Sequence, residues 1–390
     1  MTETTPELSI IMPCLNEELT VGHCIKQALD WLRTNAVCGE VVIGDNGSTD
    51  NSVAIAMQLG ARVIHVSERG YGAACYNAAL AAKGKYVIMG DADGSYNFSD
   101  LWPILENLRA GYELVMGNRF RGGIEPGAMP WKNKYLGNPV MSFIGKVLFG
   151  CPVNDFHCGL RGFSSEAFRR LDLQTTGMEY ASEMIIKATL LDLKIIEVPT
   201  TLKKDGRDRP PHLKPWRDGW RHLRFMLLFS PRWLFWYPGW LSILIGTIAL
   251  IVLYFGPVHI GGVSFDIHTM LYASLLVIAG YQSITFGVLT RTLGCQFGLL
   301  PANDYINTFN KYFKLEYVLA FGFILLLLGI IGFAWSILTW QKTGFGALDP
   351  VQTMRIIIPT SLLFIVGVQS ILSAFAISFI YLGVRRETEK

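Results

Sequence analysis

Residues 236–390 contain four long apolar segments, and these restrict the possible fold more than any other feature of the sequence. A helix needs about 20 residues to cross the hydrocarbon core of a bilayer. The segments that are long enough cover residues 238–256, 267–290, 316–340 and 356–383. We therefore expect a four-helix transmembrane domain over residues 238–390, and a purely water-soluble protein is excluded.

Charge is distributed unevenly along the chain. Residues 1–200 carry 17 Lys and Arg against 22 Asp and Glu, whereas residues 201–235 carry 9 against 3. We call residues 201–237 the basic collar. The first 200 residues are typical of a mildly acidic globular domain. The net charge of +3 averages unlike regions and therefore says nothing about partners.

The basic residues also predict an orientation in the membrane. Lys and Arg favour the cytoplasmic ends of membrane helices. The collar, the loop 291–315 and the C-terminal tail are basic, but the loop 257–266 has no Lys or Arg. We therefore expect the N-terminal domain and both termini to be cytoplasmic, although the loop with Lys342 and Arg355 fits less well.

Seven scattered cysteines without a C-x-x-C pair support neither disulfides nor zinc, in agreement with a reducing cytosol.

Apolar runs of strand length alternate with helical spacing over the first 120 residues. The predicted strands are residues 8–13, 40–45, 61–66 and 85–91, with helices over 18–33, from about 50 and from about 72. Near-continuous apolar strands separated by helices are typical of a parallel sheet covered on both faces. We therefore predict an α/β domain over residues 1–200, with ligands at the carboxyl ends of its strands.

Acidic residues gather at these strand ends. Asp91 and Asp93 directly follow the last predicted strand. Two carboxylates one residue apart suit a Mg²⁺ or Mn²⁺ ion whose shell is completed by phosphate oxygens. An exposed turn without a ligand is the alternative.

The segment from Asp45 to Asp50 has two interpretations. In the structural one, Ser48 or Thr49 caps the next helix and Asn46-Gly47 makes the turn. In the functional one, Asp45 accepts a hydrogen bond from the imide of uracil or guanine. The two interpretations use different atoms, so both can hold.

The sequence Gly70-Tyr71-Gly72-Ala73-Ala74-Cys75 has two of the three glycines of the dinucleotide fingerprint. Cys75 fills the third glycine position, and the segment follows the third strand rather than the first, so NAD binding is rejected. The glycines either let the backbone approach a nucleotide closely or form a plain entry turn to the next helix.

Taken together, these residues resemble a known family. Pro13, Asn16-Glu17, Asp45–Asp50, Gly70, Gly72, Asn77 and Asp91-x-Asp93 are similar to a family 2 glycosyltransferase of GT-A fold. Two further segments, Gly117–Gly123 and Asp155–Arg161, are similar to the polyprenyl-phosphate glycosyltransferases, the dolichol-phosphate mannose synthase group. The resemblance covers about residues 8–235 and departs from the family pattern at Asn46, Ser95, Cys158 and Leu160.

The resemblance implies roles for individual residues. Those implied to hold the nucleotide sugar are Pro13, Asn16, Glu17, Asp45, Gly70 and Asp91. Asp91 and Asp93 would bind the metal ion. Arg119 and Arg161 would meet the acceptor phosphate, a role that suits the forked donors of arginine. Asp155 would orient the nucleophile, because a phosphate is already ionised near pH 7 and needs no strong base.

Two other groups remain ambiguous. Glu179 and Glu183 are four residues apart on one helix face. One interpretation is that one of the two faces the sugar or the nucleophile, and Glu183 is then the catalytic candidate. The alternative is that either one merely pairs with a nearby Lys or Arg. His157 is a single histidine without other ligands, which is more often structural than metal-bound.

The basic collar interleaves Lys and Arg with Trp just before the first span. This composition suits an anionic lipid surface, where each charge contributes about 1 kcal/mol, and the adjoining spans argue against nucleic acid as a partner. Resemblance to the synthases implies that Arg207 and Arg209 close over the donor diphosphate; plain membrane anchoring is the alternative. Residues 136–150 and 224–237 are predicted to lie in the headgroup layer.

These observations predict an inverting transfer of one sugar from a UDP- or GDP-sugar to a polyprenyl phosphate in the lipid bilayer. A processive polysaccharide synthase is one alternative, but its Q-x-x-R-W motif is incomplete because Phe229 precedes Arg232-Trp233. A lipid-linked sugar carrier or flippase is another, and the near absence of charge within the spans argues against a transport path. The sequence leaves open the sugar, the base and whether the chain forms a homo-oligomer.

Overall fold

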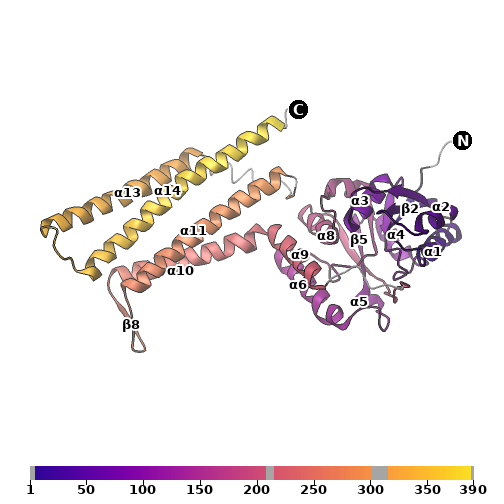
Figure 1. The fold of residues 1–390 in the computed structure, drawn as a ribbon, viewed down its shortest axis with the longest axis horizontal. Coiled ribbons are helices and arrows are strands. Elements are labelled where there is room, and N and C mark those ends of the chain that lie inside the picture. Colours follow the sequence, from indigo (N-terminus) through magenta and orange to yellow (C-terminus); the bar gives the residue numbers. More distant parts are fainter. Residues whose placement is uncertain (1–4, 208–214, 298, 301–314, 388–390) are drawn as a thin grey trace. The chain divides into compact units, whose positions relative to one another are not determined.

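The computed structural model describes residues 5–207, 215–297, 299–300 and 315–387. It divides the chain into two compact units, Met1–Leu227 and Leu228–Lys390. The basic collar is shared between these units. Each unit is described by itself (Figure 1).

A seven-stranded sheet is the centre of the N-terminal unit. Its strands are β1 (Leu8–Cys14), β2 (Gly39–Asp45), β3 (Arg62–His65), β4 (Tyr86–Met89), β5 (Leu114–Asn118), β6 (Arg161–Ser164) and β7 (Ile195–Pro199). Their order is β3-β2-β1-β4-β6-β5-β7. All neighbours are parallel except β6, which runs antiparallel between β4 and β5. The four predicted strands and the mostly parallel α/β architecture are confirmed.

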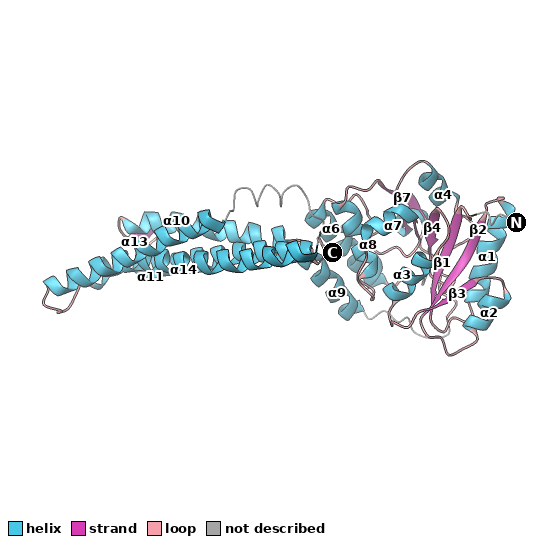
Figure 2. Ribbon diagram, turned by 90° about the horizontal axis from the view of Figure 1, so that it is seen from above, coloured by secondary structure: helices cyan, strands magenta, loops and turns pink. Residues whose placement is uncertain are grey.

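Helices cover both faces of this sheet, as Figure 2 shows for α1 and α3. The helices are α1 (Val21–Thr34), α2 (Ser52–Gln58), α3 (Tyr71–Ala81), α4 (Trp102–Arg109), α5 (Arg119–Gly122), α6 (Asn138–Phe149), α7 (Ser165–Leu171), α8 (Tyr180–Leu190) and α9 (Pro215–Leu228), with a π-helix η1 (Asn133–Gly137) before α6. Leu8, Ile10 and Met12 of β1 join a buried cluster with α1 and α4. Their neighbours along the strand point to the other face, where α3 packs on β1 and β2. This two-sided burial explains the continuous apolar runs.

The C-terminal unit consists of long apolar helices. It begins with a short π-helix, η2 (Arg232–Trp236). The elements that follow are α10 (Tyr237–Tyr254), a hairpin of β8 (Val258–Ile260) and β9 (Val263–Phe265), α11 (Ile267–Gln296), α13 (Leu315–Lys342) and α14 (Pro350–Glu387). Among the described residues, the segments long and apolar enough to cross a membrane are Arg232–Tyr254, Ile267–Gln296, Leu315–Lys342 and Pro350–Ile380. The four predicted long apolar helices are confirmed.

Close contact between α13 and α14 depends on glycine. A β-carbon on Gly329 would lie 2.7 Å from the backbone nitrogen of Phe364, and one on Gly367 would lie 2.6 Å from that of Leu326. In membranes, small residues at helix interfaces let backbones approach and gain van der Waals contact. These glycines therefore hold the second helix pair together.

We expect Gly329→Leu to push α13 away from Phe364 and to lower the thermal unfolding midpoint of the detergent-solubilised protein. Overpacking of this kind costs about 1–3 kcal/mol. Ala320→Leu, at an exposed position of the same helix, is the matched control and should leave the midpoint nearly unchanged. Equal midpoints for the two variants would contradict the proposed close packing.

Candidate functional site

The loops after β1 and β2 are tied together at the carboxyl edge of the sheet. Asn16 has a left-handed backbone (φ 56°), which short polar side chains tolerate. Its N–H donates to Ser48 Oγ at 3.0 Å, and its side-chain oxygen accepts from the N–H of Thr49 at 2.7 Å. The prediction that Ser48 or Thr49 caps the next helix is wrong, because α2 starts only at Ser52 with Asn51 as its N-cap residue. Both residues join the two loops instead.

Asp45 is the last residue of β2 and Asn46 follows it, and their side chains make different contacts. The Asp45 carboxylate accepts from the N–H of Ser48 at 3.0 Å and lies 3.3 Å from His65 Nδ1. The Asn46 amide donates to the carbonyl of Glu68 and accepts from the N–H of Gly70, each at 2.7 Å. A carboxylate in place of Asn46 could accept but not donate. This double contact gives a physical reason for the departure from the family pattern at Asn46.

Gly70 lies where another loop crosses it. Its φ is +145°, and a β-carbon there would be 2.1 Å from the carbonyl oxygen of Thr176. Only glycine fits such an approach. The interpretation of Gly70 as an entry turn to α3 is therefore correct in part, because the glycine also makes room for the loop 174–177.

Glu183 holds that same loop. It is fully buried, and its carboxylate accepts from the N–H groups of Gln174 and Thr175 at 2.9 and 2.8 Å. Its ion pair with Lys187 measures 2.9 Å. Among the alternatives for Glu183, pairing with a lysine is the observed one. These contacts give Glu183 a structural position and do not support the catalytic one.

Asp91 and Asp93 follow β4 and approach different partners. Asp91 Oδ1 accepts from the hydroxyl of Tyr71 at 2.9 Å. Asp93 Oδ1 accepts from the N–H of Ser95 at 2.9 Å, and its Oδ2 lies 3.3 Å from Arg207 Nη1. Both carboxylates thus stay at the sheet edge, as the sequence predicted.

Arg207 joins this pair to the loop after β1. Its Nη2 lies 2.7 Å from Glu17 Oε1, while its Nη1 contacts Asp93. The segment before it also binds backbone to backbone, since the N–H of Gly206 donates to the carbonyl of Asp93 at 3.0 Å. Arg207 therefore lies between Glu17 and Asp93, and its closure over a donor diphosphate stays a prediction. Arg209 lies outside the described residues.

The electrostatics of the aspartates favour a cation. Burial raises the pKa of Asp91 to about 6, the charge of Asp93 acts in the same direction, and the Tyr71 hydrogen bond opposes both. No group of three or more metal-binding side chains occurs in the part of the chain that the structure describes. Two carboxylates fit a Mg²⁺ or Mn²⁺ ion that takes its remaining ligands from a diphosphate and water.

A cavity of about 240 Å³ lies beside Asp91. The residues that line it are Tyr71, Asp91, Tyr96, Arg119, Asn133, Gly137, Asn138, Met141, His157, Gly159, Arg161, Met178, Ala181, Gly219 and His222. It thus joins the first aspartate to both arginines that the resemblance assigns to an acceptor phosphate. Neither Asp155 nor Glu183 is among these lining residues.

Asp155 acts on the cavity through Arg119. The Arg119 Nε and Nη2 atoms donate to the two carboxylate oxygens of Asp155 at 2.7 Å each, and the Arg119 N–H donates at 2.9 Å. Asp155 is fully buried, whereas Arg119 keeps 8% of its surface exposed and lines the cavity. Asp155 is therefore a positioning residue for the guanidinium.

Arg161 lies in the wall of the cavity but is held by carbonyl groups. Its Nη2 donates to the carbonyl of Cys158 at 2.6 Å and its Nη1 to that of Ala181 at 3.0 Å. The side chain is fully buried. Arg161 therefore fixes the segment 155–161 against α8 and adds positive charge behind Arg119.

Two histidines, His157 and His222, also line the cavity, and the sequence drew attention only to His157. The rings of His157 and His222 lie 4.5 Å apart, and Ser182 Oγ is 2.8 Å from His222 Nδ1. Burial, His222 and the arginines hold the pKa of His157 well below its usual range. Sequence reasoning missed His222 because nothing in the pattern of α9 indicates contact with a residue 65 positions earlier.

The π-helix η1 and α6 present two different faces. Asn133, Gly137 and Met141 line the cavity. The side chains exposed on the other face are Leu136, Val140, Phe143 and Val147, at 60, 43, 66 and 41%. Their spacing makes one apolar stripe. This stripe suits a lipid surface, and the position of residues 136–150 in the headgroup layer stays a prediction.

Comparisons with known proteins cover both units. The family Glycosyl transferase family 2 matches residues 9–172, and the Glycosyltransferase family 2 C-terminal transmembrane region matches residues 288–381. A low-salt glycan biosynthesis hexosyltransferase of Haloferax volcanii is 38% identical over 369 residues, which is 93% of this chain and 88% of that protein. A dolichyl-phosphate hexose transferase of the same organism is 33% identical over 51% of this chain and 84% of its own.

Among solved structures, a glucosyl-3-phosphoglycerate synthase from Mycobacterium tuberculosis in complex with Mn²⁺ and UDP-glucose is 23% identical. The likeness covers 57% of this chain and 78% of that one, with a TM-score of 0.44. The full-length relative and the two family matches carry the assignment. The chain belongs to glycosyltransferase family 2, as an enzyme with a GT-A domain followed by a C-terminal membrane region.

Proposed function

We propose that the enzyme transfers one sugar from a nucleotide diphosphate sugar to a polyprenyl phosphate, with inversion at the anomeric carbon. One observation carries this proposal: a single cavity is lined by Asp91, by Arg119 and by a helix that exposes an apolar stripe. A donor edge, a phosphate-binding cation and a lipid-facing helix thus meet in one place. The names of the two Haloferax relatives, a hexosyltransferase and a dolichyl-phosphate hexose transferase, support a hexose and a polyprenyl-type acceptor.

On the donor side, we assign the base to Asp45 and to the loop Pro13–Glu17. The loop is held in place by Ser48 and Thr49, so both walls of this subsite are formed before the donor arrives. Arg207 pairs with carboxylates here. A diphosphate would offer its guanidinium stronger acceptors, and Arg209, two residues on, would add a second charge.

A divalent cation at Asp91 and Asp93 would neutralise the charge that develops on the leaving diphosphate. The protein contributes by holding the two carboxylates in place and balancing their charge. Tyr71 orients Asp91 through its hydroxyl, and Arg207 balances the negative charge of Asp93 and Glu17. Buried charges of one sign need such partners.

On the acceptor side, Arg119 binds the lipid phosphate and Asp155 keeps the arginine fork aimed. A phosphate oxygen attacks the anomeric carbon, the bond between that carbon and the diphosphate oxygen breaks, and the nucleoside diphosphate leaves. The phosphate is already ionised, so no residue has to remove a proton. His157, neutral because its pKa is lowered, offers a ring nitrogen to the phosphate without adding charge.

The acceptor requires that this chemistry take place at a membrane surface. The apolar stripe on α6 supports such a position, because exposed Leu, Val and Phe side chains at helical spacing bind the headgroup boundary. We further propose that the catalytic domain and both termini are cytoplasmic, since the collar and the loop with Arg291 are basic while residues 257–266 are not.

The proposed reaction predicts a labelled product that partitions into organic solvent and is labile to mild acid. The assay incubates the purified protein with a panel of labelled UDP- and GDP-sugars, Mg²⁺ or Mn²⁺ and polyprenyl phosphate. Asp93→Asn should abolish turnover by removing one metal-binding carboxylate. Asp100→Asn, at an exposed position nearby, is the control. Full turnover in EDTA would contradict the metal role.

We expect Asp155→Asn to release Arg119, so that the KM for polyprenyl phosphate rises about tenfold or more while the KM for the donor changes little. Loss of one partner of a buried pair also destabilises the fold by about 3–5 kcal/mol. Glu113→Gln breaks the exposed pair with Arg170 and should alter neither value much. Equal effects on both substrates would refute the assignment of Arg119 to the acceptor.

Mn²⁺ affinity should depend on pH through Asp91. Below a pKa of about 6 the carboxyl holds a proton that the ion must displace, so affinity falls about tenfold per pH unit on the acid side. Titration calorimetry between pH 5 and 7.5 measures this. Tyr71→Phe removes a hydrogen bond that lowers the pKa, so the midpoint should move to higher pH. An unchanged midpoint would show that Asp91 does not control binding.

A further inference from the structure

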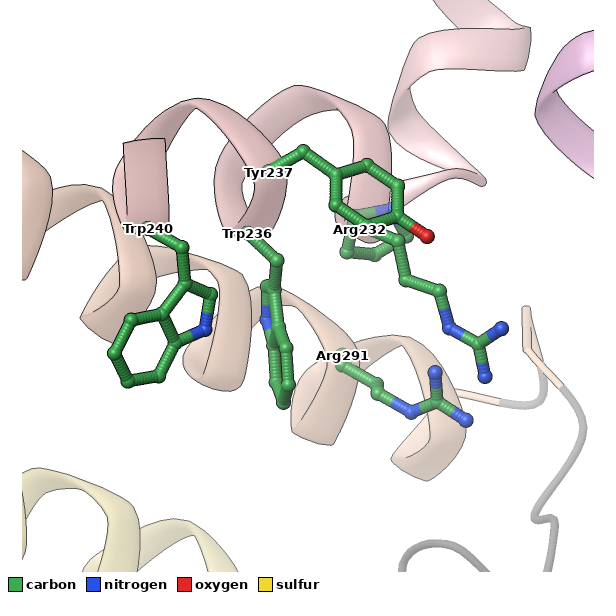
Figure 3. Close-up of a pocket in the computed structure, with 6 residues that line it drawn as sticks. Arg232, Trp236, Tyr237, Trp240 and Arg291 are labelled. Carbon is green, nitrogen blue, oxygen red and sulfur yellow. The ribbon is translucent and has the colours of Figure 1, made fainter. Parts of the chain in front are cut away.

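A second cavity lies within the C-terminal unit, where η2 and the start of α10 pack on the end of α11 (Figure 3). Its volume is about 330 Å³. The residues that line it are Pro231, Arg232, Trp236, Tyr237, Trp240 and Arg291. We call it the arginine-aromatic pocket. None of the roles proposed above uses it.

The wall of this pocket is built by close packing. A β-carbon on Gly287 would lie 2.5 Å from Trp236 Cδ1, so only glycine lets the indole lie against α11. The hydroxyl of Ser283 donates to the carbonyl of Phe235 at 2.9 Å, which ties η2 to the same helix. Short π-helical turns inside helices often occur at functional sites. Trp236 is therefore a fixed wall between the two helices.

The two arginines enter the pocket from different helices. Arg232 begins η2, and Arg291 lies one turn after Gly287 on α11. Figure 3 shows that both side chains extend in the same direction, away from Trp240. Trp240 and Tyr237 are more than half exposed, at 57 and 54%. The pocket thus combines a charged end with an open aromatic end.

The side chains of the pocket favour an anion, because two of them are arginines. Arginine forks bind phosphate oxygens through paired N–H groups. Trp and Tyr side chains at the ends of membrane helices lie at the level of the lipid headgroups. Phosphate on a lipid matches both ends of the pocket.

We propose that the arginine-aromatic pocket binds the phosphate headgroup of a membrane lipid. Arg232 and Arg291 hold the phosphate oxygens, and Trp236 and Trp240 contact the first carbons of the lipid chain. The shared chemistry is a lipid phosphate, which a polyprenyl phosphate or an anionic phospholipid can supply. This site is independent of sugar transfer, because binding here needs neither the donor nor the aspartates of the N-terminal unit.

The test is lipid binding by the full-length protein in neutral detergent, measured by native mass spectrometry without any sugar donor. The probes are polyprenyl phosphate, phosphatidylglycerol, phosphatidylcholine and inorganic phosphate. Arg232→Gln/Arg291→Gln should weaken the binding of both anionic lipids about tenfold or more, since hydrogen bonds to charged groups are strong. Binding of phosphatidylcholine should decrease by less.

The matched control is Arg221→Gln/Arg224→Gln, which removes the same charge from two exposed positions of α9. It should weaken anionic lipid binding no more than about twofold, as expected of screened surface charges. Equal losses in the two double variants would overturn the proposal in favour of general attraction to a basic surface. Inorganic phosphate that binds as tightly as the lipids would overturn the assignment to a lipid.

The two lipid probes identify the source of the phosphate. A larger loss for polyprenyl phosphate than for phosphatidylglycerol supports a pocket for the acceptor lipid, and equal losses support a general anionic lipid. If the double variant does not fold, Arg291→Lys is tested alone. It keeps the charge but not the fork, so a loss of about threefold or more supports the proposal and unchanged binding overturns it. Because no donor is present, failure of the sugar-transfer assay leaves these results interpretable.

Discussion

Negative charge concentrated at one edge of the sheet is the constraint on which the site depends. Asp91 and Asp93 follow β4 with one residue between them, and burial together with the charge of Asp93 raises the pKa of Asp91 to about 6. Arg207 is the internal counterion, because it contacts Asp93 and Glu17 at once. Its segment also donates from Gly206 to the Asp93 carbonyl. A cation that binds the aspartates must therefore share them with Arg207. A diphosphate that binds nearby can accept hydrogen bonds from the Arg207 guanidinium. Charge balance thus links the basic collar to the donor edge.

The acceptor cavity is organised by fully buried charged residues that hold its walls in place. Asp155 holds Arg119, Arg161 fixes the segment 155–161 against α8, and Glu183 secures the loop that passes over Gly70. Burying such charges is tolerated only when each is paired and hydrogen-bonded, which these contacts provide. The result is a preformed site in which Arg119, the two histidines and Asp91 line one cavity. Preformed geometry lowers the entropy that the substrates would otherwise lose on binding.

The membrane unit follows different rules from the catalytic unit. Its helices are apolar all round, so packing cannot come from the hydrophobic effect and relies on close backbone contact at Gly329 and Gly367. At the end of the first helix pair, Gly287 has the same function for Trp236 and thereby shapes the arginine-aromatic pocket.

The sequence by itself determined the four spans, the first four strands and the acidic edge, because burial on both sheet faces and exposure to lipid each leave a continuous apolar run whose length can be read directly. It also indicated Arg119 and Asp155, but not that they pair. Only the tertiary structure decided which charged residues face a cavity and which serve as supports. In the sequence, Asp155, Glu183 and Arg161 cannot be told from catalytic residues, and only their burial and their contacts with distant residues identify them as supports. His222 and the antiparallel strand β6 were not predicted for the same reason: a contact between distant segments leaves no mark on the local pattern of either one.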